Sequence, residues 1–139
     1  MGDKQMHFLE FISVYLLGAI GYGSLEILWR GYTHWTMLLL GGLCYYLIYL
    51  ISTRMAGPLW KTLLMCGAVI TSLEFSVGCL VNLRLGWHVW DYSDLPLNLM
   101  GQICPAFCAL WLLLSLPCIW LSRLLYKYIF RPNFKSRKV

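Results

Sequence analysis

One polar stretch interrupts an otherwise apolar chain and carries residue types that could do chemistry. It is GWHVWDYSDLPLNLMGQIC, residues 86–104, with two aspartates, a histidine, an asparagine and a glutamine. Such carboxylates and amides could bind a cation, a proton, or an amine or sugar-like headgroup, and Asp91 with Asp94 could hold Mg²⁺. The alternative is an elbow at a membrane surface, anchored by Trp90 and Tyr92, whose polar groups cap and hydrogen-bond one another.

The second half of this stretch has the pattern of a helix start. Ser93 and Asp94 precede Pro96, and a hydroxyl or carboxylate caps free N–H groups where proline is tolerated in the first turn. In such a helix Asp94, Asn98 and Gln102 would follow one another at spacings of four and share one side. The spacing predicts a polar stripe that leads into the last apolar run.

Two glutamates lie inside apolar runs, on stripes of small and polar residues at helical spacing. The stripes are Ala19, Gly23, Glu26 and Arg30 in the first run, and Gly67, Thr71, Glu74, Gly78 and Asn82 in the third. An ionised side chain near the bilayer centre costs at least about 2.5 to 3.5 kcal/mol, so it normally faces the bundle interior and marks function. We expect Glu26 and Glu74 to join the polar stretch in one outward-facing site. The alternatives are that Glu26 neutralises Arg30 and that Glu74 is protonated or hydrogen-bonded in the core. Glu10 is expected as a solvated charge at a helix end.

The elements that must position these residues are membrane-spanning helices. Hydrophobic residues make up 60% of the 139 residues and charged residues 12%, with a mean hydropathy of +0.66, a balance that does not suit a water-soluble domain. A spanning helix needs about 20 apolar residues. Four runs qualify, at about 8–29, 35–52, 59–83 and 101–125. The prediction is a single all-α membrane domain over 1–139, with four transmembrane helices and an interfacial or re-entrant segment between the third and fourth.

Basic residues predict the orientation, because Lys and Arg near helix ends are retained on the cytoplasmic side. With four spans both termini share a side. Nine of the eleven basic residues would lie there: Lys4, Arg54, Lys61, Arg123, Lys127, Arg131, Lys135, Arg137 and Lys138. Both termini are therefore expected in the cytoplasm. The basic tail, 126–139, suits anionic lipid headgroups better than nucleic acid.

Several kinds of chemistry have no signature in the chain. The patterns GxxxxGK[ST], GxSxG and HExxH are missing, so nucleotide hydrolysis or the corresponding hydrolase chemistry is not expected by those routes. The six cysteines fall inside predicted spans and form no CxxC pair. They are expected to act as small apolar packing residues. No cofactor is expected, and whether the acids hold a metal stays open.

Three runs together carry a family resemblance: GYGSLEILWR, SLEF and WDYSDLPLNLMGQIC. They resemble the small bacterial membrane proteins described as putative ABC-transporter type IV, or CmpB-like, over most of the chain. The resemblance implies a multi-pass protein of the bacterial cell membrane with a permease-like role. Carried over by position, it singles out Glu26, Glu74, Trp90, Asp91, Tyr92, Ser93, Pro96, Asn98, Gly101, Gln102 and Cys104. Asp94 departs from the family pattern, where Asn is expected, and the extra acid could alter charge preference.

The leading hypothesis is a transporter permease component or a small oligomeric carrier with an outward-facing carboxylate and amide site. The predicted site residues are Glu26, Glu74, Trp90, Asp91, Tyr92, Ser93, Asp94, Asn98 and Gln102. Four helices leave little room for a private pathway, so a homo-oligomer or a partner subunit is expected in addition to membrane lipids. ATP would come from a separate ATPase, whereas proton coupling through Glu74 is the self-contained route. The alternatives are a membrane-embedded enzyme acting on a lipid or lipid-linked headgroup, and a non-catalytic membrane scaffold.

Overall fold

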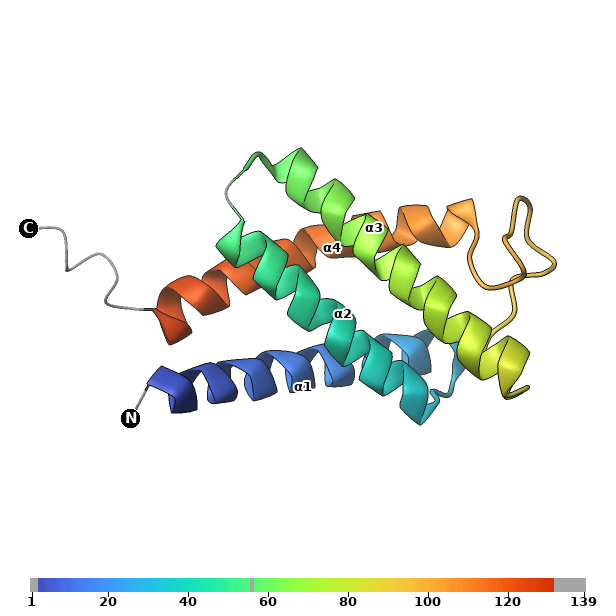
Figure 1. The fold of residues 1–139 in the computed structure, drawn as a ribbon, viewed down its shortest axis with the longest axis horizontal. Helices are drawn as coiled ribbons and strands as arrows, with labels where there is room; N and C mark the ends of the chain where they lie inside the picture. The colour runs from blue at the N-terminus through green and yellow to red at the C-terminus, as the bar shows by residue number, and fades with distance from the viewer. Residues whose placement is uncertain (1–2, 56, 132–139) are drawn as a thin grey trace, which may run out of the picture.

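The computed structural model describes residues 3–55 and 57–131, and it places long helices throughout this part of the chain (Figure 1). The helices are α1 (Asp3–Arg30), α2 (Trp35–Arg54), α3 (Leu59–Gly78) and α4 (Pro105–Leu125), and α3 and α4 continue as the π-helical turns η1 (Cys79–Arg84) and η2 (Tyr126–Phe130). All four long helices are long and apolar enough to cross a membrane. The predicted all-α fold with four helices able to span a membrane is confirmed. Residues Lys135, Arg137 and Lys138 of the predicted basic tail lie outside the described residues.

The helices run up and down, so that both ends of the described chain lie at one end of the bundle (Figure 1). The segment between α3 and α4 lies at the opposite end, with the short α1–α2 connection. The extensive helix pairs are α1–α2, α2–α3, α2–α4 and α3–α4. Helix α2 is therefore the centre of the bundle, and α1 is held chiefly by α2.

Glycines allow α1 and α2 to approach closely. A Cβ atom on Gly41 would lie 2.5 Å from the Tyr22 Cβ, and one on Gly42 would lie 2.9 Å from the Tyr15 main-chain oxygen. Close backbone approach matters in a membrane because lipid tails leave little hydrophobic drive for helix association. Glycine at these positions is thus required by the α1–α2 contact itself.

The predicted stripes face the interior of the bundle. Gly67, Glu74, Gly78 and Asn82 are all buried along α3 and η1, and Thr71 is half-buried. On α1, the corresponding Ala19, Gly23 and Glu26 are buried as well. Helical spacing of small and polar residues therefore predicted the inward faces of both helices correctly.

The predicted helix start at Ser93 and Asp94 is wrong, and the fourth helix begins at Pro105 instead of near residue 101. Leu97, Met100 and Gly101 have φ angles of 56°, 54° and 69°, which belong to the left-handed region that a right-handed helix excludes. Proline stands in the first turn of this helix at Pro105 rather than at Pro96, and the N-cap residue Cys104 makes no side-chain capping hydrogen bond. Residues 85–104 consequently form a compact loop at the end of the bundle.

Replacing Gly42 by alanine should destabilise the protein, because the added methyl group meets both the ring and the carbonyl of Tyr15. The expected loss is about 1 to 3 kcal/mol, the usual cost of overpacking, measured by thermal unfolding of the purified protein in detergent. Gly21→Ala is the matched control, since a Cβ there meets no atom within 4 Å. Equal melting temperatures for the two variants would contradict the close α1–α2 contact.

Candidate functional site

The Glu74 carboxylate lies inside the bundle and joins three segments of the chain. Its side chain is only 3% exposed. The Tyr92 hydroxyl, from the loop, donates a hydrogen bond to one carboxylate oxygen at 3.0 Å, and the Trp111 indole N–H, from α4, donates to the other at 2.5 Å. Glu74 on α3 thus connects the loop and α4 from within.

Both oxygens of Glu74 accept hydrogen bonds. The indole N–H of Trp111 can only donate. Burial, followed by the charge of Glu74 and the hydrogen bond to it, raises the pKa of the Tyr92 phenol, so this hydroxyl keeps the proton that it donates. Among the described residues, no Lys, Arg or His side chain lies within 4.0 Å of the Glu74 carboxylate. The carboxylate therefore has neutral donors around it and no positive partner, which makes it a candidate for binding a cation or a proton.

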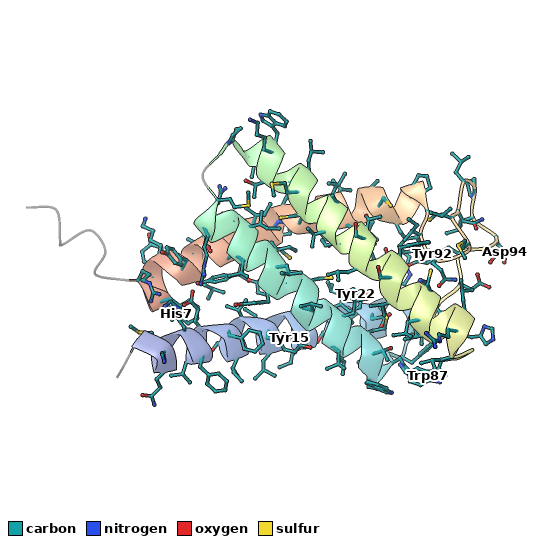
Figure 2. The ribbon with its side chains drawn as sticks, viewed as in Figure 1. His7, Tyr15, Tyr22, Trp87, Tyr92 and Asp94 are labelled. Atoms are coloured by element: carbon teal, nitrogen blue, oxygen red, sulfur yellow. The ribbon has the colours of Figure 1, made fainter. Side chains whose placement is uncertain are left out.

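A cavity of about 260 Å³ lies beside Glu74 and is lined by residues of all four long helices. Its walls are mostly apolar, and Glu74 is the one acid among the residues that line it. The rings of Tyr22 and Trp111 also line the cavity, with centroids 6.0 Å apart. Figure 2 shows Tyr22 in the middle of the bundle and Tyr92 nearer the loop end. A bound group in this cavity would meet the side chains of Tyr22, Trp111 and Glu74.

Glu26 belongs to a separate ion pair. Its carboxylate accepts hydrogen bonds from Arg30, at 2.5 Å, and from the Thr33 hydroxyl. The same guanidinium donates to the main-chain oxygen of Val89 at 3.1 Å, which attaches the loop to the end of α1. The alternative in which Glu26 neutralises Arg30 is what the geometry shows.

Two buried amides attach the rest of the loop to the bundle. The Asn82 amide N–H donates to the Gln102 side-chain oxygen at 2.8 Å, and the Asn82 oxygen accepts from the Val89 N–H at 2.7 Å. The Trp90 indole donates to the main-chain oxygen of Gln102 at 3.0 Å. Asn82, Trp90 and Gln102 are all nearly fully buried. Their polar groups are therefore used to hold the loop in place.

Asp91, Ser93 and Asn98 hydrogen-bond within the loop itself. Ser93 donates to Asp91 through its hydroxyl and its main-chain N–H, and these bonds hold the pKa of the Asp91 carboxyl below its usual range. The Asn98 amide donates to the main-chain oxygens of Ser93 and Leu95. Asp94 is exposed at the outer edge of the loop, far from Tyr22 (Figure 2). The predicted stripe of Asp94, Asn98 and Gln102 does not form, because the loop is not helical there.

Two residues of structural importance were not predicted from the sequence. Trp111 was not assigned to the site, although an indole N–H inside an apolar helix needs an acceptor and is a usable signal. Glu10 was expected to be solvated, but it is 2% exposed and accepts a hydrogen bond from Tyr49. Arg131 lies 3.6 Å from the same carboxylate. Glu10 lies four residues before Val14, so the two share a helix face. Val14 is buried, and Glu10 is buried with it.

Comparison with known proteins identifies a family. A family model described as "Putative ABC-transporter type IV" matches residues 22–137. The matched region contains Glu74, the whole loop and α4, and therefore both residues that donate hydrogen bonds to the Glu74 carboxylate. No curated protein and no solved structure matches the chain.

Shortening Gln102 to alanine should loosen the loop, because it leaves the buried Asn82 amide without its acceptor. We expect a loss of about 1 to 3 kcal/mol of stability, the cost of an unsatisfied buried polar group, together with faster amide hydrogen exchange in residues 86–104. The control is Asp94→Ala, which removes an exposed side chain of the same loop. Similar exchange rates in both variants would count against the anchoring role of Gln102.

Proposed function

The chain belongs to the putative ABC-transporter type IV family, and on this premise we propose that it is a membrane-embedded component of a transporter whose transport site is built on Glu74. The observation that carries the proposal is the buried Glu74 carboxylate beside a cavity, with two neutral donors and no basic partner among the described residues. Ionisable residues at this depth normally mark substrate, ion or proton pathways. A catalytic role needs reactive groups beside the carboxylate, and Asp91 and Asp94 lie in the exposed part of the loop.

The depth of Glu74 supports a transport role. The carboxylate lies in α3, well inside a helix that is long enough to span the membrane. The loop covers it from one end of the bundle through Tyr92, and the helices surround it on the other sides. Transport sites commonly lie inside the bundle, where helices or their connections can move to expose them alternately to either side. In this proposal Tyr92 and the loop form the outer cover of the site.

In this proposal the energy for transport comes from a separate ATPase subunit or from the proton gradient. The sequence has no nucleotide-binding pattern, and the family description points to an ATP-driven system. Basic residues gather at the end of the bundle opposite the loop, including Arg54, Lys61 and Lys127. We place this end in the cytoplasm of a bacterial cell, where a separate ATPase subunit would dock. Proton exchange at Glu74 is the route that needs no such subunit.

Apart from Tyr92 and the exposed Asp94, the other predicted site residues support the site in this proposal and do not bind the cargo. Glu26 pairs with Arg30, which attaches the loop to the end of α1 through Val89, and Gln102 attaches the last part of the loop to η1. Trp90 covers Gly78, where a Cβ would lie 2.9 Å from the indole ring. Asp91, Ser93 and Asn98 shape the loop that carries Tyr92. Their expected effect on transport is indirect, through the position of Tyr92.

Changing Glu74 to glutamine should abolish transport while leaving the protein folded, because the amide keeps the size of the side chain and loses its charge. We would measure uptake of labelled organic cations, amino acids, sugars and divalent metal ions into inverted membrane vesicles, driven by ATP or by a proton gradient. At least one solute class should show uptake that depends on the chain. Glu74→Gln should reduce that uptake by about tenfold or more at equal amounts of protein.

The matched control is Asp94→Asn, the same loss of charge at an exposed carboxylate. It should leave uptake unchanged. Chain-dependent uptake that is the same in Glu74→Gln and wild type would disprove the role of Glu74. A full panel with no chain-dependent uptake would disprove the transport function.

A further inference from the structure

We propose that the cavity binds a hydrophobic amine, an organic cation with an apolar body, and that this ligand enters sideways from the membrane between α1 and α4. The ammonium group would pair with the Glu74 carboxylate. This inference rests on the proposed function and gives its site a ligand class and an access route. It comes from three features of the cavity: its opening, its lining and the charge at its wall.

The opening of the cavity faces lipid. Four residues that line the cavity are exposed at the surface of the molecule, and they are Leu17, Gly21, Leu25 and Pro117. The first three belong to α1 and the last to α4, whereas every cavity residue of α2 and α3 is buried or half-buried. Helices α1 and α4 do not form one of the extensive helix pairs. The cavity therefore opens between these two helices, in the middle of their spans.

The lining selects for an apolar ligand. The wall of the cavity is made mainly of aliphatic and aromatic side chains. A sugar or another neutral polar solute would lose its hydrogen bonds with water on entering a cavity with such a lining. A divalent metal ion needs several oxygen ligands, and Glu74 is the one carboxylate among the lining residues. An apolar ligand body, in contrast, can pack against this wall without losing hydrogen bonds.

The charge at the wall selects for a cation. Glu74 has hydrogen bonds from Tyr92 and Trp111 but no basic side chain within 4.0 Å among the residues described. A buried charge without a partner of opposite sign is unfavourable, and a bound ammonium group would supply that partner. The aromatic rings of Tyr22 and Trp111 line the same cavity, and their faces attract organic cations. One carboxylate and two rings suit an ammonium group better than a metal ion.

The size of the cavity indicates how the ligand would lie. At about 260 Å³ the cavity is slightly smaller than the range of about 300 to 1,000 Å³ for sites that enclose drug-sized ligands. The ammonium end and part of the hydrophobic body would fill it. The rest of an alkyl chain would extend through the opening between α1 and α4 into the lipid.

The test is equilibrium binding of a labelled alkyltrimethylammonium ion to the purified chain in lipid nanodiscs, with empty nanodiscs as background. The comparison ligand is its uncharged isostere, in which carbon replaces the quaternary nitrogen. Wild type should bind the cation saturably and more tightly than the isostere. Glu74→Gln should weaken cation binding by about tenfold or more and leave isostere binding unchanged.

A second pair of variants tests the opening without touching Glu74. Gly21→Phe places a ring in the mouth of the cavity, where a Cβ meets no atom within 4 Å, and it should reduce cation binding. Ile20→Phe is the matched control, because Ile20 is 66% exposed and does not line the cavity. Equal binding by these two variants would overturn the lateral route.

The binding result can be separated from the transport result. Cation binding that is absent, unchanged in Glu74→Gln, or equal to isostere binding would overturn the ligand class, even if another solute shows Glu74-dependent uptake. Glu74-dependent cation binding without uptake of any solute would support the ligand class and overturn the transport function.

Discussion

The Glu74 carboxylate accepts hydrogen bonds from Tyr92 and Trp111, and these two contacts allow an acid to remain inside an apolar helical bundle. Removing a carboxylate from water costs several kcal/mol even after the protein relaxes. Hydrogen bonds to a charged group contribute about 1.5 to 3 kcal/mol each. The two donors therefore offset much of this cost. They do not neutralise the carboxylate, so its negative charge can still attract a cation or a proton. The loop and α4 have to be placed so that both donors reach α3.

The loop meets this requirement through its own anchors. Tyr92 stacks on Phe107, with ring centroids 4.4 Å apart and planes 11° apart, which sets the direction of its hydroxyl toward α3. Asn82 and Gln102 join η1 to the last part of the loop, and Arg30 joins the end of α1 to Val89. Irregular backbone at the edge of a membrane persists only where protein groups or water satisfy it. The polar residues that seemed candidates for ligand binding mostly serve this purpose.

Prediction from the sequence was most successful where neighbours in the chain decide the structure. The Glu26 and Arg30 pair is four residues apart, so helical geometry alone brings the two side chains together. Prediction failed at residues 93–104, where Ser93, Asp94 and Pro96 have the pattern of a helix start. The helix begins at Pro105 instead, after an N-cap residue, Cys104, whose side chain makes no capping hydrogen bond. Near Pro96 the Asn98 amide hydrogen-bonds to Ser93 and Leu95 and stabilises a turn, and such side-chain bonds to the main chain compete with helix formation.

The sequence by itself determined four spanning helices, the inward faces of two of them, and the presence of acids at a depth where charge is costly. These properties follow from hydropathy and helical periodicity, which act over a few neighbouring residues. Tertiary structure decided which groups surround Glu74, since Tyr92 and Trp111 are 18 and 37 positions away. It also decided that the cavity opens between α1 and α4. Contacts at such separations depend on how closely the helices pack and where the loop is held, and no local pattern encodes them.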